Sequence, residues 1–211
     1  KKAIALKPDY PVYLVNFSMV LDYLNKSDEA KLQLEKIPRL LADKHSLRGK
    51  INLAIYKFLE DDFTLSKKYL SESSEVMQIF VPELENYRIY HGYLTKILSS
   101  LQDKPSNIDE KIYVIGDSHA LVSHGISVPL SKNNFLCKSI LIMGCTQWEL
   151  GNSSKNQYKI KFENTIRSLP KSSKILLSIG EIDCRLNYGI IKHNDKYPKK
   201  NRLDLVKFTI E

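Results

Sequence analysis

Three short apolar segments in the second half of the chain, each followed at once by a loop that contains glycine, constrain the fold most strongly. The segments span Ile112–Ile115, Ser139–Met143 and Ile175–Ile179, and a helical pattern over Tyr158–Leu169 separates the last two. Apolar runs of this length predict strands, and strands separated by helices predict a parallel sheet. The carboxyl ends of parallel strands lie at one edge of the sheet, where open α/β sheets bind ligands. The three loops are therefore the candidate site.

The loop after the first predicted strand is Gly116–His119, with the sequence Gly-Asp-Ser-His, and the helix-compatible segment Ala120–Val122 follows it. This order places the Ser118 hydroxyl at the edge of the sheet and near the N-terminus of a helix, where backbone N–H groups favour negative charge. Acyl-transfer reactions develop negative charge in such a place, so Ser118 is the candidate nucleophile. Asp and Ser are also ordinary turn and N-cap residues, and a purely structural turn is the alternative.

The loops after the other two predicted strands are Gly144–Trp148 and Gly180–Arg185. The second of these loops contains Glu181, Asp183 and Arg185. A carboxylate two or four residues before an arginine is typical of an ion pair that fixes a loop. A catalytic role for this charged set is the alternative.

Two further side chains in these loops have competing interpretations. His119 lies next to Ser118, and because neighbouring side chains point apart, we interpret it as a structural or substrate-binding group and not as the base. Trp148, the only tryptophan, is a candidate for stacking on a sugar ring, and packing in a half-buried position is the equal alternative.

The first 70 residues contain an internal repeat with an offset of 36 residues. Asn16–Ser18 corresponds to Asn52–Ala54, and Leu34 corresponds to Leu70. The apolar spacing within each unit is helical, and a turn at Asn25–Ser27 separates two helices of the first unit. Each unit is therefore predicted to be a helix pair.

These helix pairs resemble tetratricopeptide repeats. The segment Ala3–Tyr10 is similar to the repeat ending of that family, and the resemblance covers residues 1–72. Leu14 stands where the family often has Trp, and Asn25 and Asp61 stand where it often has Gly. The resemblance implies a platform that binds a protein or polymer partner. Because the chain opens in the middle of a repeat, we expect it to be a fragment.

Helical spacing continues over residues 83–101, and residues 102–107 have the Pro, Ser and Asn content of a linker. We therefore predict a helical repeat region over residues 1–101, a linker over residues 102–110 and an α/β domain over residues 111–211. The predicted fold class is helical repeats followed by an α/β domain.

The Gly-Asp-Ser of the first loop, the glycine loop after the second strand and the Gly-Glu-Ile-Asp of the third loop resemble the SGNH (GDSL-type) hydrolases. The resemblance implies a flavodoxin-like, three-layer α/β domain with a parallel sheet. It also implies that Ser118 is the nucleophile and that its amide, with the amide of Gly144 or Gly151, forms the oxyanion hole. The third motif of the family is Gly-x-Asn-Asp, and its Asn also donates to the oxyanion. Asp183 matches the last residue of this motif, but Ile182 occupies the position of the Asn. Loss of one oxyanion donor typically lowers the rate about 100- to 1,000-fold.

The late Asp-x-x-His motif that supplies the base in this family does not occur after Cys184. A serine hydroxyl without a base is a poor nucleophile at neutral pH. We therefore expect the domain to be incomplete at its C-terminus, with the histidine beyond Glu211, and the chain to be inactive as it stands. His193 follows the third predicted strand too soon to match the motif, and its use as the base is the alternative.

The combined features are similar to bacterial proteins that join helical repeats to an SGNH-like domain. This resemblance implies a serine esterase or acyltransferase that acts on an ester-linked acyl group in glycan metabolism, and that needs no metal and no organic cofactor. The alternative is a catalytically inactive scaffold that keeps a ligand cleft, and Ile182 in place of Asn favours it.

The net charge of +8 comes entirely from residues 111–211, because acidic and basic side chains balance over residues 1–110. Positive charge suits an anionic partner, but scattered lysines usually form a solvated surface. No alternation of basic and aromatic residues indicates nucleic-acid binding. No apolar run approaches the roughly 18 residues of a membrane span. The cysteines show no metal-ligand spacing, which favours reduced thiols in a cytoplasmic protein.

Overall fold

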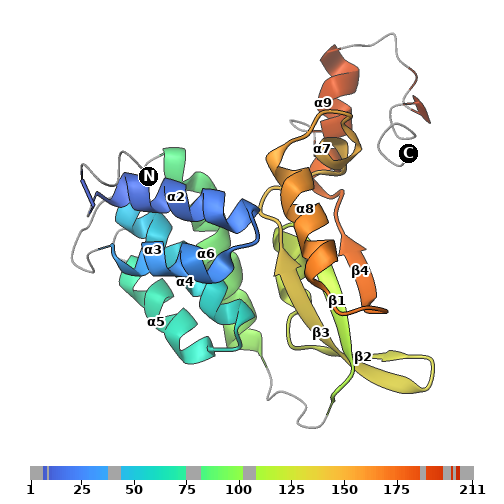
Figure 1. Ribbon diagram of the computed structural model, residues 1–211, viewed down its shortest axis with the longest axis horizontal. Coiled ribbons are helices and arrows are strands. Elements are labelled where there is room, and N and C mark those ends of the chain that lie inside the picture. The colour runs from blue at the N-terminus through green and yellow to red at the C-terminus, as the bar shows by residue number, and fades with distance from the viewer. Residues whose placement is uncertain are drawn as a thin grey trace. The chain divides into compact units, whose positions relative to one another are not determined.

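The computed structural model divides the chain into two compact units, residues 1–104 and 105–211. The first unit is helical and the second combines helices with a sheet, which confirms the expected helical region followed by an α/β unit (Figure 1). The structure describes residues 7, 8, 10–37, 44–74, 82–101, 108–185, 189–196, 201, 203 and 204. Residues 102–107 of the linker expected over residues 102–110 lie outside these residues, as does most of the repeat ending expected over residues 3–10.

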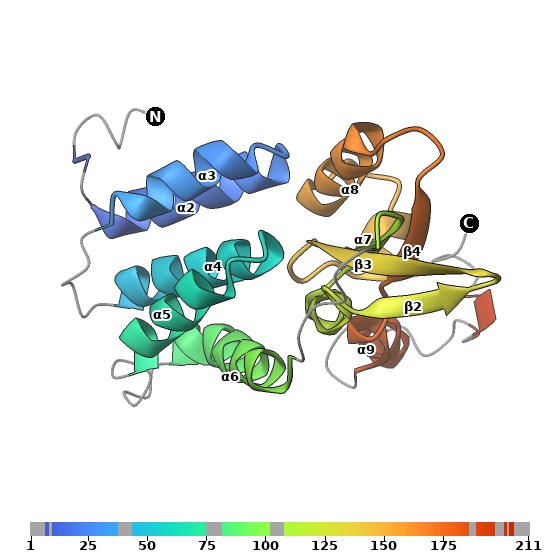
Figure 2. The same ribbon diagram turned by 90° about the horizontal axis from the view of Figure 1, so that it is seen from below.

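The helices of the first unit pack against one another in chain order. They are α2 (Pro11–Tyr23), α3 (Ser27–Glu35), α4 (Lys44–Leu59), α5 (Phe63–Ser74), a 3-10 helix η2 (Pro82–Leu84) and α6 (Glu85–Ser100). α2 packs on α3, α4 packs on α5, and α6 packs on α4 and α5 (Figure 2). Leu14 and Val15 of α2 share one apolar core with Leu34 of α3 and Leu53 of α4. Burial of this core on folding stabilises the unit because it removes apolar surface from water.

The turns that join α2 to α3 and α4 to α5 are built alike. Asn25 and Asp61 occupy the same place in the two turns, and both adopt left-handed φ angles, of 60° and 69°. Glycine, the residue that the tetratricopeptide family often has here, adopts this conformation at the least cost. Each turn is closed by an equivalent backbone hydrogen bond of 2.9 Å, from Lys26 N–H to Leu21 O and from Asp62 N–H to Lys57 O. The repeat in the sequence is therefore also a repeat in the backbone.

α6 carries its apolar residues on one buried side, as the helical spacing predicts. The buried residues are Tyr87, Tyr90, Leu94, Ile97 and Leu98. None of the helices in the described part of the chain combines the length and the apolar character that are needed to cross a membrane.

The second unit is built on a mixed sheet of four strands. The strands are β1 (Lys111–Gly116), β2 (Ser127–Leu130), β3 (Asn133–Leu141) and β4 (Lys174–Ser178), in the order β2-β3-β1-β4. β3 and β4 lie on either side of β1 and run parallel to it, whereas β2 pairs antiparallel with β3. The helices of the unit are η3 (Ser118–Ser123), α7 (Gln147–Gly151), α8 (Gln157–Ser168), η4 (Ile182–Cys184) and α9 (Gly189–Lys196).

The sheet corrects the sequence prediction at its second strand. β3 ends at Leu141 and not at Met143, and it forms a hairpin with β2, so the sheet is not wholly parallel. The hairpin escapes prediction because β2 has only four residues and contains Pro129, which is tolerated at the edge of a sheet. The helix after β1 is a 3-10 turn, η3, and not an α-helix.

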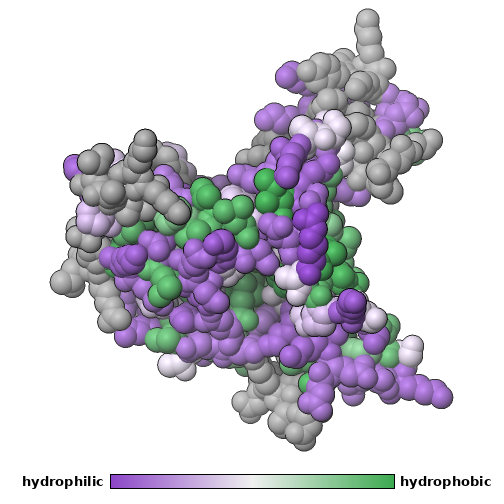
Figure 3. All heavy atoms as spheres, in the orientation of Figure 1, coloured by the Kyte–Doolittle hydropathy of each residue, from purple (hydrophilic) through white to green (hydrophobic). Residues whose placement is uncertain are grey.

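β4 forms the other edge of the sheet and exposes apolar side chains. Ile175, Leu176 and Leu177 are 40%, 50% and 55% exposed. Figure 3 shows apolar surface at the place of β4. Because successive strand residues point to opposite faces, both faces of β4 are open to solvent. Among the described residues, no strand pairs with the outer edge of β4.

Candidate functional site

The pairing of the strands brings the three candidate loops to one edge of the second unit. Gly116, the last residue of β1, pairs with Leu141 of β3 on one side and with Ser178 of β4 on the other. All three strands are parallel, so the loops that follow them leave the sheet at the same edge. The site is therefore built from the loop containing Asp117 and from the loops after β3 and β4.

Gly116 is required by the close approach of β4. A Cβ atom placed on this residue lies only 2.1 Å from the carbonyl oxygen of Ser178 and 2.8 Å from its carbonyl carbon. The N–H of Asp117 donates a hydrogen bond of 3.3 Å to the same carbonyl oxygen. Glycine therefore lets the two strands converge directly below the Asp117 and Ser118 loop.

Ser118 begins η3 and is half-buried at the end of β1. Within the described residues, neither its hydroxyl nor its amide N–H takes part in a hydrogen bond. The amide of Gly144, in the neighbouring loop after β3, is likewise unused among the described residues, and Gly144 has a left-handed φ of 72°. One free hydroxyl and two free amides therefore lie in adjacent loops, and such amides are the donors that stabilise an oxyanion.

Asp117 holds His119 in place. The Asp117 side chain is 1% exposed, and its Oδ1 accepts a hydrogen bond of 2.9 Å from the backbone N–H of His119. The ring Nδ1 of His119 lies 3.0 Å from the same oxygen, and the ring is 44% exposed. The other carboxylate oxygen, Oδ2, is buried without a hydrogen-bond partner. Asp117 thus caps η3, orients the imidazole and keeps one acceptor unused.

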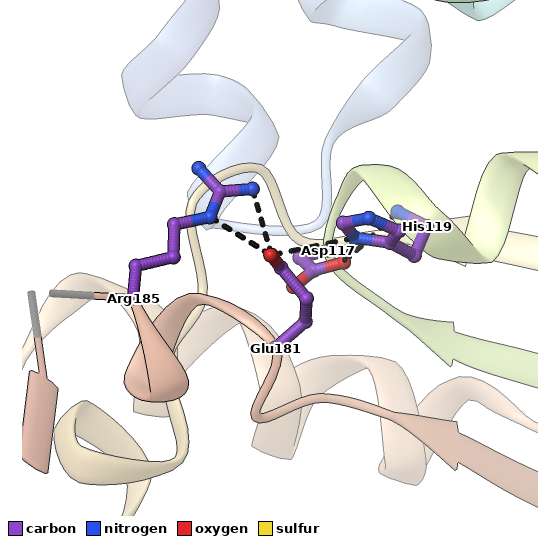
Figure 4. Close-up of polar contacts among 4 residues, drawn as sticks. All are labelled: Asp117, His119, Glu181 and Arg185. Carbon is purple, nitrogen blue, oxygen red and sulfur yellow. Dashed lines mark hydrogen bonds and ion pairs between the residues drawn. The ribbon is translucent and has the colours of Figure 1, made fainter.

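Glu181 lies between His119 and Arg185 (Figure 4). Arg185 donates three hydrogen bonds of 2.7 to 3.0 Å to the Glu181 carboxylate, which is the ion pair expected from their spacing. These hydrogen bonds hold the pKa of Glu181 below its ordinary value. Glu181 Oε2 also lies 3.8 Å from His119 Nδ1. The loops after β1 and β4 therefore meet through one imidazole and two carboxylates.

Asp183 has a structural position. Its side chain is 1% exposed, and its two oxygens accept hydrogen bonds of 2.6 Å from the N–H of Gln147 and 3.0 Å from the N–H of Trp148. These amides belong to the first turn of α7, where N–H groups lack partners within the helix. Asp183 therefore ties the loop after β4 to the helix after β3, and both of its oxygens are occupied.

The remaining residues of the predicted site lie on or near α7. Trp148 is half-buried in the first turn of α7. Gly151 is the last residue of α7, so of the two candidate oxyanion glycines Gly144 lies closer along the chain to the end of β3. Burial, with nearby carboxylates as smaller contributions, raises the pKa of the Cys145 thiol to about 12. A thiol with such a pKa stays protonated at neutral pH, so Cys145 is not a nucleophile.

Sequence reasoning placed the three loops at one edge but did not find the contact between His119 and Glu181. Only the pairing of β4 with β1 brings these distant residues together. The hydrogen bond from the His119 N–H to the Asp117 carboxylate was also not predicted, although an Asp just before a helix is an N-cap signal.

Comparison with known proteins adds no relative, since no family model, no curated protein and no solved structure matches the chain.

Proposed function

We propose that the second unit is an SGNH-like domain that hydrolyses or transfers an ester-linked acyl group, with Ser118 as the nucleophile. The observation that carries the proposal is the position of Ser118 at the carboxyl end of β1. Within the part of the chain that the structure describes, its hydroxyl and amide are unused, as is the amide of Gly144 in the adjacent loop. A flavodoxin-like arrangement of the domain is part of the same proposal, and the parallel core of the sheet supports it.

In the proposed reaction, Ser118 Oγ attacks the acyl carbonyl carbon and the carbonyl oxygen becomes an oxyanion. The amides of Ser118 and Gly144 donate to that oxygen, and the alcohol leaves as the ester bond breaks. The Oγ proton passes to a base and then to the leaving alcohol. No imidazole among the described residues is hydrogen-bonded to Ser118 Oγ. Asp183 does not supply this base, because both of its oxygens accept backbone hydrogen bonds.

The test is hydrolysis of a small activated acetate ester by the complete protein that contains this chain, as wild type and as two variants. We expect Ser118→Ala to lower the rate at least about 100-fold, since removal of a nucleophile costs this much or more. Ser123→Ala, at the other end of η3, is the matched control and should keep the wild-type rate. Equal rates in wild type and Ser118→Ala contradict the proposal and favour the inactive scaffold.

We further propose that the first unit binds a protein or polymer partner through its helix pairs. A cavity of about 210 Å³ between α3, α4 and α5 supports this, because it combines apolar and charged walls. Leu34, Leu53 and Tyr69 supply apolar surface, and Lys50 and Glu72, 3.9 Å apart, supply opposite charges. Peptides that fill the cavity should shift the NMR signals of Tyr69 and Lys50. Shifts confined to other parts of the chain contradict this use of the cavity.

A further inference from the structure

We propose that Asp117, His119 and Glu181 bind a divalent first-row cation, with Zn²⁺ as the best fit. The role of this cation in activating Ser118 rests on the proposed function, whereas the binding site itself stands on the geometry of the three side chains. The resemblance to SGNH hydrolases implies no metal. The three ligands come from two loops and have no recognisable spacing in the sequence.

The three side chains already have the separation of a metal site. One ligand atom from each lies within 4.8 Å of the others. His119 Nδ1 is 3.0 Å from Asp117 Oδ1 and 3.8 Å from Glu181 Oε2. Zinc bonds of about 2.0–2.2 Å in a tetrahedral site place neighbouring ligand atoms about 3.4 Å apart, between these two values. Forming the site requires side-chain rotations that bring the Asp117 and Glu181 oxygens, now within 4.8 Å, to about this separation.

The unused oxygen of Asp117 is an independent sign of a missing ligand. Asp117 is 1% exposed, and its Oδ2 is buried without a partner. A buried carboxylate oxygen without a hydrogen bond is costly, and coordination of a cation removes that cost. Figure 4 shows the Asp117 carboxylate between the His119 ring and the Glu181 carboxylate. The unused acceptor thus belongs to the group that lies at the centre of the cluster.

The donor set selects the type of cation. Two carboxylates and one imidazole suit Zn²⁺ or Mn²⁺, whereas Mg²⁺ and Ca²⁺ prefer oxygen ligands alone. His119 binds through Nδ1, so its contact with Asp117 Oδ1 is given up. Asp117 Oδ1 keeps the hydrogen bond from the His119 backbone N–H, and the unused Oδ2 is the oxygen that binds the cation. Glu181 can bind the cation and still accept hydrogen bonds from Arg185, because a carboxylate has about four lone-pair sites. Arg185 then orients Glu181, as hydrogen-bonded outer groups do in metal sites.

Three protein ligands leave a coordination position open for water or substrate, as in catalytic zinc sites. Ser118 lies between Asp117 and His119 in the sequence, so its backbone belongs to the same loop as two of the ligands. A zinc ion lowers the pKa of a bound water to about 7 and polarises a carbonyl oxygen. In this proposal a hydroxide held by the cation would accept the Ser118 Oγ proton, and the resulting water would return a proton to the leaving alcohol. Among the described side chains, no imidazole is hydrogen-bonded to Ser118 Oγ.

The experiment is calorimetric titration of the metal-free chain with Zn²⁺ near neutral pH, with Mg²⁺ as a second probe. We expect one equivalent of Zn²⁺ to bind, and His119→Ala and Glu181→Gln to weaken binding at least about ten-fold. Both side chains are more than 40% exposed, so these changes leave the fold intact. Glu163→Gln is the matched control, because Glu163 also pairs with an arginine four residues later. Its binding should equal that of wild type.

Three results overturn the metal site: no Zn²⁺ binding, Mg²⁺ binding as tight as Zn²⁺, or wild-type affinity in His119→Ala and Glu181→Gln. Loss of binding in Cys184→Ser alone, at the exposed thiol, also overturns it. Failure of the proposed function is a separate outcome. If Zn²⁺ binds as expected and Ser118→Ala hydrolyses the ester like wild type, the metal site stands and the nucleophile is wrong. If a chelator leaves Ser118-dependent hydrolysis unchanged, the role of the cation is wrong.

Discussion

Replacement of Gly116 by Ala tests how the sheet positions the site. The added Cβ lies 2.1 Å from Ser178 O, and ordinary contact begins near 3.4 Å, so the two backbones must separate locally by about 1.3 Å. Overpacking of this kind costs about 1–3 kcal/mol, and the weakened hydrogen bond from Asp117 N–H to Ser178 O adds about 1 kcal/mol. We therefore expect Gly116→Ala to destabilise the second unit by about 3 kcal/mol.

The assay follows thermal unfolding by the fluorescence of Trp148, the only tryptophan, which reports on the second unit. A loss of about 3 kcal/mol lowers the Tm of a unit of this size by more than about 10 °C. Gly92→Ala is the control. No atom lies within 4 Å of a Cβ at Gly92, so this change in α6 should add about 0.5–1 kcal/mol to the first unit and leave the Trp148 transition unchanged. An unchanged Trp148 transition in Gly116→Ala refutes the close approach of the strands.

Three further predictions concern the site and the edge of the sheet. Asp183→Asn leaves one α7 amide without an acceptor and should lower the stability measured by Trp148 fluorescence by about 2 kcal/mol. The ion pair of Glu181 with Arg185 lowers the pKa of Glu181. The pair therefore contributes at most about 1 kcal/mol to the free energy of unfolding above pH 4.5, the ordinary pKa of Glu, and this contribution is lost as the pH falls further. Urea unfolding of Arg185→Gln and wild type should differ at pH 7 and converge at low pH. Leu177→Lys, on the exposed apolar edge strand, should reduce self-association in light scattering without changing the Tm.

Features fixed by local pattern were predictable from the sequence. Apolar runs located β1 and β4 to within one residue at each end, because short runs of β-branched and other apolar residues favour strands. The exposure of β4 did not follow from its apolar sequence. The repeat offset placed Asn25 and Asp61 in equivalent turns, and both turns have the same backbone geometry.

Features that depend on distant pairing were not predictable. The hairpin of β2 with β3 was missed, since β2 is too short for a periodic signal. In the sequence, Asp183 is one of three charged residues in a loop. Its oxygens accept hydrogen bonds from amides of α7, and nothing in the local sequence specifies that contact. The meeting of His119 with Glu181 likewise depends on the register between β1 and β4.

The central claim, that Ser118 is a nucleophile, is tested most directly by mass-spectrometric mapping of the adduct formed with a fluorophosphonate probe. The complete protein that contains this chain is treated with and without added Zn²⁺, because activation by the cation is a separate claim. The account predicts a covalent adduct on Ser118 that is absent in Ser118→Ala and present in Ser123→Ala. An adduct on other serines only, or no adduct under either condition, contradicts the account and leaves a ligand-binding scaffold as the better description.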